Sequence, residues 1–178
     1  MKRLVALTLA CAAWLPLGAH AALKPGDAAP KFETTAALAG KPFAFDLAEA
    51  LKKGPVVVYF FPKAFTRGCT IEANAFAEAT PQFAALGARV IGISHDDIDT
   101  LKRFSTEACR DRFAVGSDPQ GRTIQAYDAA SLLPGVANRI SYVIGQDGRI
   151  AFVHQGSDPL RHVEQTLKAL GDGVGARR

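Results

Sequence analysis

Features typical of metal-binding, membrane and repeat proteins are missing from this sequence. It has three cysteines in 178 residues, none of them paired as CxxC, and no histidine lies close in sequence to Cys69 or Cys109. Metal sites that combine cysteine and histidine ligands at short spacing are therefore not expected. No segment beyond the first 21 residues is apolar for long enough to cross a bilayer, and no internal repeat is found. These absences leave one compact soluble domain as the expectation.

The N-terminal residues differ from the rest of the chain. Lys2 and Arg3 precede an apolar stretch without acidic residues, which runs to about residue 19 and ends in Ala19-His20-Ala21. A basic start, an apolar middle and small residues around the cut are typical of a cleavable signal peptide. We therefore predict a signal peptide at 1–21, cleavage after Ala21, and export to the periplasm or out of the cell.

Two other interpretations of this segment are weaker. A permanent membrane anchor is disfavoured because Pro16, Gly18 and His20 interrupt an apolar stretch that is already short for a span. Lipid attachment at Cys11 is disfavoured because that cysteine lies early in the apolar stretch, with further apolar residues behind it. After cleavage, 19 basic and 17 acidic residues remain, a net charge of about +2. This small charge predicts neither a nucleic-acid partner nor attachment to a membrane surface.

The patterns of the mature chain alternate between strand and helix periods. Residues 56–61 form a continuous β-branched and aromatic run, which is typical of a strand buried on both faces. Further strands are expected at 32–34, 43–45, 90–93, 140–144 and 149–153, and helices at 69–87, 97–108, 123–127 and 159–170. Pro81 should kink or interrupt the first of these helices. This order predicts an α/β, thioredoxin-like domain over 22–170, with a central mixed β-sheet flanked by helices on both faces, and a flexible tail at 171–178.

Cys69 lies at the most informative place in the sequence. A buried strand ends at Pro62, a short loop follows, and the cysteine then opens a helix. The partial positive charge and unpaired N–H groups of a helix start favour the thiolate over the thiol. By position alone, an inert buried cysteine fits equally well.

The residues around Cys69 resemble those of a known family. Pro62, Thr66 and Cys69 fit the peroxiredoxin pattern PxxxTxxC, and Glu72 stands where that family usually has an acidic residue. The run YFFPKAFTRGCTIEA is similar to the bacterioferritin comigratory protein (PrxQ-type) branch, and the likeness extends over roughly residues 24–170, including Arg139 before the strand at 140–144. It implies a thiol-dependent peroxidase that reduces hydrogen peroxide and organic hydroperoxides and has no metal or other cofactor.

The resemblance also implies roles for individual residues. Cys69 attacks the peroxide, and Arg139 holds its guanidinium against the thiolate and the substrate. Thr66 offers a hydroxyl, and Pro62 shields the sulfur from water. The substrate would be bound by Gly68 and Cys69 through their backbone N–H groups, together with Glu72. Groups placed where charge develops on the departing oxygen lower the barrier most.

The step that follows oxidation of Cys69 is less clear from the sequence. Many PrxQ-type proteins have a second cysteine five residues after the first, but this chain has Asn74 there. Cys109 is the remaining candidate resolving residue, and we predict an intramolecular Cys69–Cys109 disulfide. The alternative is that Cys109 takes no part and that a small thiol or another chain reduces Cys69. A disulfide needs Cα atoms within about 7 Å, so some unwinding around Cys69 is expected.

The expected partners follow from this assignment. They are a peroxide substrate and a thioredoxin-like or small-thiol reductant, and we expect a monomer. Two other functions remain as alternatives. A thiol–disulfide oxidoreductase or a copper-delivery protein would normally need closely spaced cysteines, which are absent. A non-catalytic binding module would have no need for Pro62, Thr66, Cys69 and Arg139 together. His95, His154 and His162 are expected to be surface or partly buried residues, and Asp96 and Asp97 are expected at a helix start.

Overall fold

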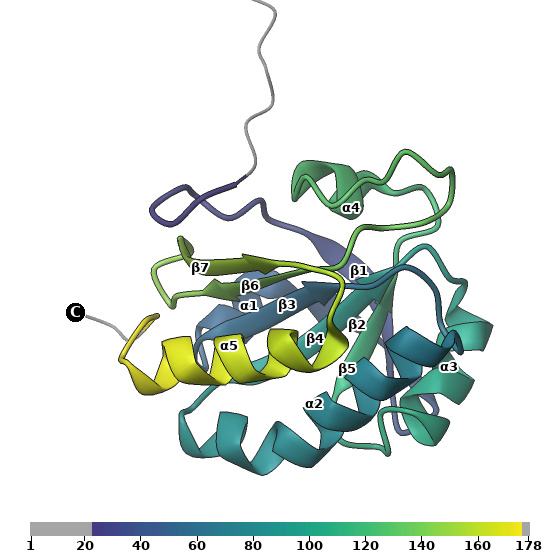
Figure 1. The fold of residues 1–178 in the computed structure, drawn as a ribbon, viewed down its shortest axis with the longest axis horizontal. Coiled ribbons are helices and arrows are strands. Elements are labelled where there is room, and N and C mark those ends of the chain that lie inside the picture. Colours follow the sequence, from purple (N-terminus) through teal and green to yellow (C-terminus); the bar gives the residue numbers. More distant parts are fainter. Residues whose placement is uncertain (1–22, 176–178) are drawn as a thin grey trace, which may run out of the picture.

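The computed structural model describes residues 23–175, so the predicted signal peptide at 1–21 lies outside the described residues. Within that range, seven strands form one mixed sheet in the order β2-β1-β5-β4-β3-β6-β7 (Figure 1). The strands are β1 (Glu33–Leu38), β2 (Lys41–Asp46), β3 (Val56–Phe60), β4 (Arg89–Ser94), β5 (Ala114–Ser117), β6 (Ile140–Ile144) and β7 (Ile150–Gln155). The helices are α1 (Leu47–Leu51), α2 (Arg67–Ala85), α3 (Ile98–Glu107), α4 (Arg122–Ala126) and α5 (Pro159–Gly171).

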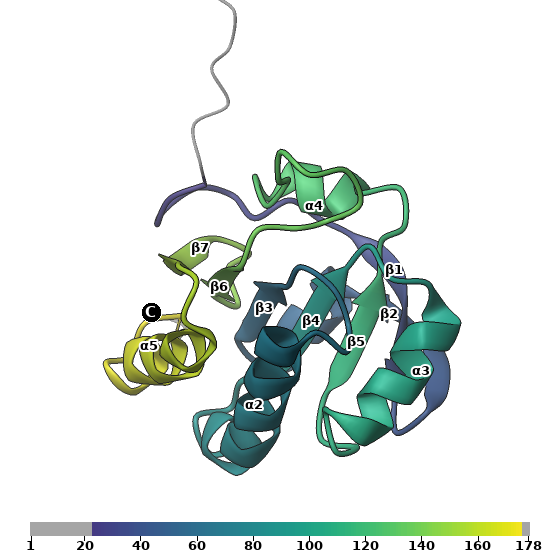
Figure 2. The same cartoon turned by 45° about the vertical axis from the view of Figure 1, so that its right-hand side comes forward.

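Strand β3 lies at the centre of the fold. It pairs in parallel with β4 and antiparallel with β6, and all five of its residues are buried. Successive side chains of a strand point to opposite faces. Val57 and Tyr59 accordingly pack in one apolar cluster with residues of α2, α3 and α5, and Val58 and Phe60 pack in a second cluster with residues of α1 and α4. Helices therefore cover both faces of the sheet (Figure 2), which confirms the predicted thioredoxin-like architecture.

Two elements were not predicted from the sequence. Strand β5 has four residues and contains Gly116, so its apolar pattern is short and interrupted. A Cβ at Gly116 would lie 2.7 Å from the Ile93 side chain and 2.8 Å from that of Thr34, so this glycine lets β5 fit between β1 and β4. Helix α1 has five residues and is preceded by the N-cap residue Asp46, whose side chain accepts hydrogen bonds from the amides of Ala48 and Glu49.

Helix α2 starts earlier than predicted. It begins at Arg67 rather than at Cys69, and it runs through Pro81 without interruption, whereas a kink at this proline stays a prediction. A proline removes one intrahelical hydrogen bond and crowds the preceding turn. Phe76 and Phe83 are buried on either side of Pro81, and their packing against the sheet holds the helix together across it.

The C-terminal tail is only partly described. Its residues 172–175 form a turn after α5, in which the amide of Val174 donates to the carbonyl of Ala169 and the Val174 side chain packs against the first cluster. Residues 176–178 lie outside the described part of the chain.

Candidate active site

The start of α2 positions Cys69. Thr66 is the N-cap residue and Cys69 is the third residue of the helix. The amides of Gly68 and Cys69 lie in the first turn, where N–H groups have no carbonyl partner within the helix. The Cys69 side chain lies in the same first turn, where the helix dipole favours negative charge. The cysteine itself is only 1% exposed.

Arg139 contacts Cys69 from the segment that leads into β6. It directly precedes β6, which is paired with β3, so the sheet brings it beside the loop that leads to α2. Its Nη2 donates to the Sγ of Cys69 at 3.5 Å. A Cβ at Gly68 would lie 3.2 Å from the same Nη2, so a glycine at this position leaves room for the guanidinium. The sheet and the helix together hold the positively charged guanidinium of Arg139 beside the Cys69 sulfur.

Glu72 holds Arg139 from behind. Its side chain is fully buried one turn after Cys69, and its Oε2 accepts a hydrogen bond from Arg139 Nη1. Burial raises the pKa of the Glu72 carboxyl to about 8, while Arg139 acts in the opposite direction. Its Oε1 has no hydrogen-bond partner among the described residues. The Glu72 carboxyl group is enclosed behind Arg139, where it holds the guanidinium in place, and its contact with a substrate stays a prediction.

Thr66 and Pro62 form the outer part of the site. The Thr66 hydroxyl donates to the carbonyl of Lys63 at 2.9 Å, and the residue is exposed. In this arrangement the hydroxyl hydrogen is used within the loop, and the oxygen is left to accept a hydrogen bond. Pro62 and Arg139 both line an open cleft of about 490 Å³, formed also by residues 131, 136–138 and 155–157. A larger cleft of about 780 Å³ beside β1 has no cysteine among its lining residues.

Asp96 fixes the loop before Cys69, a role that sequence reasoning missed. Its Oδ2 accepts hydrogen bonds from the Ala64 amide and from the Ser94 hydroxyl, both at 2.8 Å. Asp97 alone caps α3, accepting from the Thr100 amide at 2.8 Å. The prediction that both aspartates serve the helix start is therefore wrong for Asp96. No local pattern distinguishes the two, because the loop that Asp96 binds is 32 residues away in sequence.

His162 also differs from its prediction, since it is fully buried. Its Nε2 lies 3.0 Å from the Gly156 carbonyl and its Nδ1 lies 2.8 Å from the Ser141 hydroxyl, so the ring donates to the former and accepts from the latter. Its Nδ1 is 4.0 Å from Glu72 Oε1. Burial lowers the pKa of His162 to about 4. The helical spacing of His162 with Thr166 and Ala169 is the signal that could have placed it on the buried face.

Cys109 lies in the turn after α3, two residues beyond the last helical residue. Both Cys69 and Cys109 are free, buried thiols, and they belong to the same apolar cluster. Burial raises the pKa of the Cys109 thiol, and Asp111 adds to this effect. The neighbouring Arg110 bonds to Asn74 of α2, with Nε donating to Oδ1 at 3.1 Å. The turn that holds Cys109 is thus attached to the helix that holds Cys69.

The described residues offer neither a metal site nor a membrane-spanning helix. Among residues 23–175, no group of three histidine, cysteine or acidic side chains is arranged to hold a metal ion. No helix in the same range is both long and apolar enough to span a membrane.

Comparison with known proteins gives a consistent result. The model of the AhpC/TSA family matches residues 25–153. A curated relative, chloroplastic peroxiredoxin Q from Gentiana triflora, is 35% identical over 121 residues, which is 67% of this chain and 55% of the relative. Chloroplastic peroxiredoxin Q from Arabidopsis thaliana is 34% identical over 155 residues, 84% of this chain and 68% of the relative. The chain thus spans little more than half the length of the first of these relatives.

Solved structures are similar as well. Peroxidoxin BcpB from Mycobacterium tuberculosis has a TM-score of 0.77 and 29% identity, with 84% of this chain and 97% of that one covered. A cysteine-to-serine mutant of PrxQ from Xylella fastidiosa has a TM-score of 0.76 at 22% identity, covering 86% of this chain and 98% of that one. The second likeness bears on the fold alone.

Proposed function

The chain belongs to the AhpC/TSA family as a PrxQ-type peroxiredoxin, and we propose that it is an exported thiol peroxidase whose attacking nucleophile is Cys69. The observation that carries this proposal is the hydrogen bond from Arg139 Nη2 to Cys69 Sγ at the start of α2. A cation and a helix N-terminus at one sulfur favour its thiolate, the form that attacks a peroxide.

The first step is attack of the Cys69 thiolate on one peroxide oxygen. A sulfur–oxygen bond forms, the O–O bond breaks, and the departing oxygen takes a proton and leaves as water or as an alcohol. Cys69 becomes a sulfenic acid. Arg139 and the amides of Gly68 and Cys69 stabilise the charge that develops on the departing oxygen. Thr66 accepts a hydrogen bond from the substrate, and Pro62 forms the wall of the cleft.

The second step forms the Cys69–Cys109 disulfide. The Cys109 sulfur attacks the sulfenic sulfur, and water leaves with the proton of the Cys109 thiol. The presence of both sulfurs in one buried cluster supports this route. A thioredoxin-like protein or a small thiol then reduces the disulfide.

Location and partners belong to the same proposal. The N-terminal pattern supports removal of residues 1–21 and export to the periplasm, although the curated relatives carry the description chloroplastic. We expect a monomer that binds neither nucleic acid nor, once processed, a membrane.

Steady-state turnover tests the proposal. The parent protein and the variants Cys69→Ser and Cys109→Ser are supplied with dithiothreitol, and consumption of hydrogen peroxide and of cumene hydroperoxide is followed. We expect turnover in the parent and its loss in Cys69→Ser. Cys109→Ser should consume peroxide at the parental initial rate and should then lose activity faster than the parent, through overoxidation of Cys69. If Cys69→Ser consumes peroxide as the parent does, the binding-module alternative replaces the peroxidase.

A further inference from the structure

The three tyrosines of the chain differ in the hydrogen bonding of their hydroxyl groups. The hydroxyl of Tyr127 donates to the carbonyl of Pro30 at 2.7 Å, and that of Tyr142 to the carbonyl of Tyr127 at 2.6 Å. The hydroxyl of Tyr59 is buried and has no hydrogen-bond partner among the described residues. Buried hydroxyl groups are nearly always paired, and leaving one unpaired is costly. A phenylalanine would avoid that cost, so the hydroxyl of Tyr59 is a candidate for a role outside the resting state.

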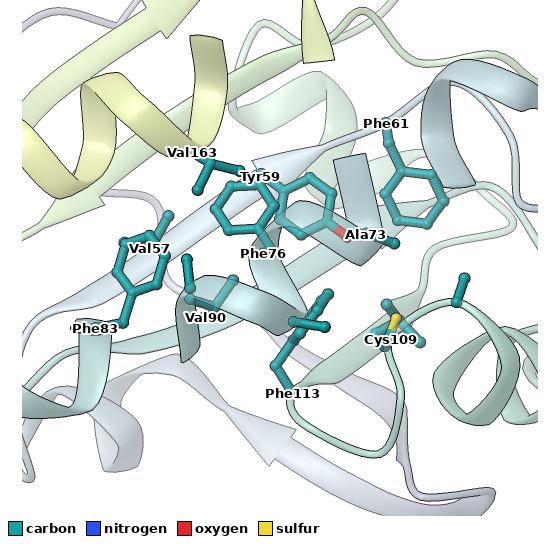
Figure 3. Packing of buried hydrophobic residues seen from close by; sticks show 14 of the residues in the cluster. Val57, Tyr59, Phe61, Ala73, Phe76, Phe83, Val90, Cys109, Phe113 and Val163 are labelled. Carbon is teal, nitrogen blue, oxygen red and sulfur yellow. The ribbon is translucent and has the colours of Figure 1, made fainter. Parts of the chain in front are cut away.

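The surroundings of Tyr59 leave space for this hydroxyl. Its ring stacks on Phe76 with 4.5 Å between the centroids, and it lies against the backbone of β4 at Gly92. A Cβ at Gly92 would come within 2.7 Å of the Tyr59 hydroxyl oxygen, so any other residue there would displace the ring. In Figure 3 the hydroxyl end of Tyr59 points to the side of the cluster that contains Ala73 and Cys109.

Both cysteines of the described chain lie in the cluster that contains Tyr59. Burial raises the pKa of Tyr59 well above its ordinary value, and the charge of a Cys109 thiolate adds to the effect, followed by Glu72 and Cys69. Tyr59 therefore stays a hydrogen-bond donor at every physiological pH. Cys109, by contrast, is a buried thiol whose ionisation is opposed both by burial and by Asp111. Neither of these two influences favours the Cys109 thiolate, so the resolving step calls for a group that does.

We propose that Tyr59 supplies this group: its hydroxyl donates a hydrogen bond to Cys109 Sγ as that sulfur ionises to attack the sulfenic acid of Cys69. The inference rests on the proposed peroxidase cycle and assigns one of its steps. The S–H bond of Cys109 and the S–O bond of Cys69 break, the S–S bond forms, and the proton leaves with the oxygen as water. Tyr59 keeps its own proton throughout. A hydrogen bond to the charged form of a thiol favours that form, most of all in a buried site.

The variant Tyr59→Phe tests the inference, because it removes one unpaired oxygen and keeps the ring. Tyr142→Phe is the matched control, a buried tyrosine of the other cluster whose hydroxyl is paired. Purified parent and variants are mixed with one equivalent of hydrogen peroxide, quenched at intervals and analysed by mass spectrometry. Loss of the Cys69 thiol reports the first step, and the Cys69–Cys109 linked peptide reports the second.

We expect Tyr59→Phe to lose the Cys69 thiol at the parental rate and to form the disulfide about tenfold more slowly, the effect of one hydrogen bond to a charged group. The rate of disulfide formation should also move to higher pH in this variant, and overoxidation of Cys69 should increase. The melting temperature should not fall, because no native hydrogen bond is lost. Tyr142→Phe should melt lower and form the disulfide at the parental rate.

The other outcomes are distinguishable. Equal disulfide rates in the parent and Tyr59→Phe would overturn the inference and leave the peroxidase standing. A lower melting temperature of Tyr59→Phe with both steps slowed equally would make Tyr59 a packing residue and would also overturn it. Oxidation of Cys69 in the parent without any linked peptide would remove Cys109, and Tyr59 with it, from the cycle. An unreactive Cys69 would contradict the proposed function itself.

Discussion

Arg139 is in contact with two groups that compete for its charge. Its Nη2 donates to Cys69 Sγ and its Nη1 to Glu72 Oε2, and its side chain is 10% exposed. Glu72 fixes the guanidinium in place, yet a fully ionised Glu72 also neutralises part of the charge that acts on the sulfur. The protonation of Glu72 therefore affects both the stability of the protein and the reactivity of Cys69.

The substitution Glu72→Gln should remove a pH dependence of stability. Burial raises the pKa of Glu72 from 4.5 to about 8, so the folded state holds a proton that the unfolded state has released. The resulting contribution of Glu72 to the free energy of unfolding is fully present below about pH 4.5 and is lost as the pH rises through 8. We expect the free energy of unfolding of the parent to fall by roughly 1–2 kcal/mol between pH 6.5 and 8, measured by urea denaturation.

In Glu72→Gln this slope should be absent. Glu107→Gln, at the exposed end of α3, serves as the control and should keep it. A parental slope that persists in Glu72→Gln would assign the titration to another group.

The residues of the site differ in how far the sequence could predict them. Pro62, Thr66 and Cys69 lie in one short segment, where the resemblance to the peroxiredoxin pattern groups them. Asp96 and His162 join the site through tertiary contacts with Ala64 and Ser141. The helical spacing of His162 indicates its burial, but only the folded structure shows either contact.

At the scale of elements, α2 has a different role at each end. Its first turn contains Cys69, and its C-terminal part contains the exposed Pro81. A proline inside a helix costs about 3 kcal/mol relative to alanine. Because the Pro81 ring is exposed, little packing would be lost with it.

Pro81→Ala should therefore stabilise the protein. We expect a gain of about 1–3 kcal/mol in the free energy of unfolding, measured by urea denaturation, with unchanged peroxide turnover. A loss of stability would mean that the proline ring contributes contacts or a bend on which the packing of α2 depends.

The turn between α3 and β5 has a strained backbone, and it is hydrogen-bonded to α2. Arg110 and Asp111 have φ values of 51° and 58°, a region that non-glycine residues rarely adopt. The Arg110 side chain bonds to Asn74 and, through Nη1 at 3.1 Å, to Glu78. These contacts hold Cys109 buried against the first cluster.

Arg110→Ala should therefore make the Cys109 turn open more easily. Exposed ion pairs contribute about 0–1 kcal/mol, so global stability should change little. The Cys69–Cys109 disulfide should form faster, as followed by quenched mass spectrometry, and the Cys109 amide should exchange its hydrogen faster. Lys102→Ala, which breaks another exposed ion pair of α3, should change neither rate. An unchanged rate in Arg110→Ala would show that opening of this turn does not limit resolution.

Long, strongly patterned elements were predictable, whereas two short ones, β5 and α1, were not. The run at 56–61 and the hairpin at 140–144 and 149–153 have enough residues to show their period, and the structure confirms both as β3, β6 and β7. Strand β5 and helix α1 contain four and five residues. Strand β5 is defined by its neighbours β1 and β4 in the sheet, and helix α1 by its Asp46 cap, rather than by an apolar pattern of their own.

At the scale of the whole molecule, the sheet brings together groups that are distant in sequence. Arg139 follows Cys69 by 70 residues, and pairing of β3 with β6 makes them neighbours. The two thiols share one buried cluster, so the proposed disulfide would require part of that cluster to open and close in each cycle. The proposed cycle therefore combines a rigid site for the first step with a mobile one for the second.

Direct trapping of the oxidised sulfur tests the central claim, that Cys69 is the peroxidatic nucleophile. The variant Cys109→Ser is treated with one equivalent of hydrogen peroxide in the presence of dimedone, which labels sulfenic acids, and is then mapped by mass spectrometry. The account predicts a single adduct on the peptide that contains Cys69, and none in a Cys69→Ser protein treated in the same way. An unlabelled, fully reduced Cys69 in the Cys109→Ser protein would contradict it.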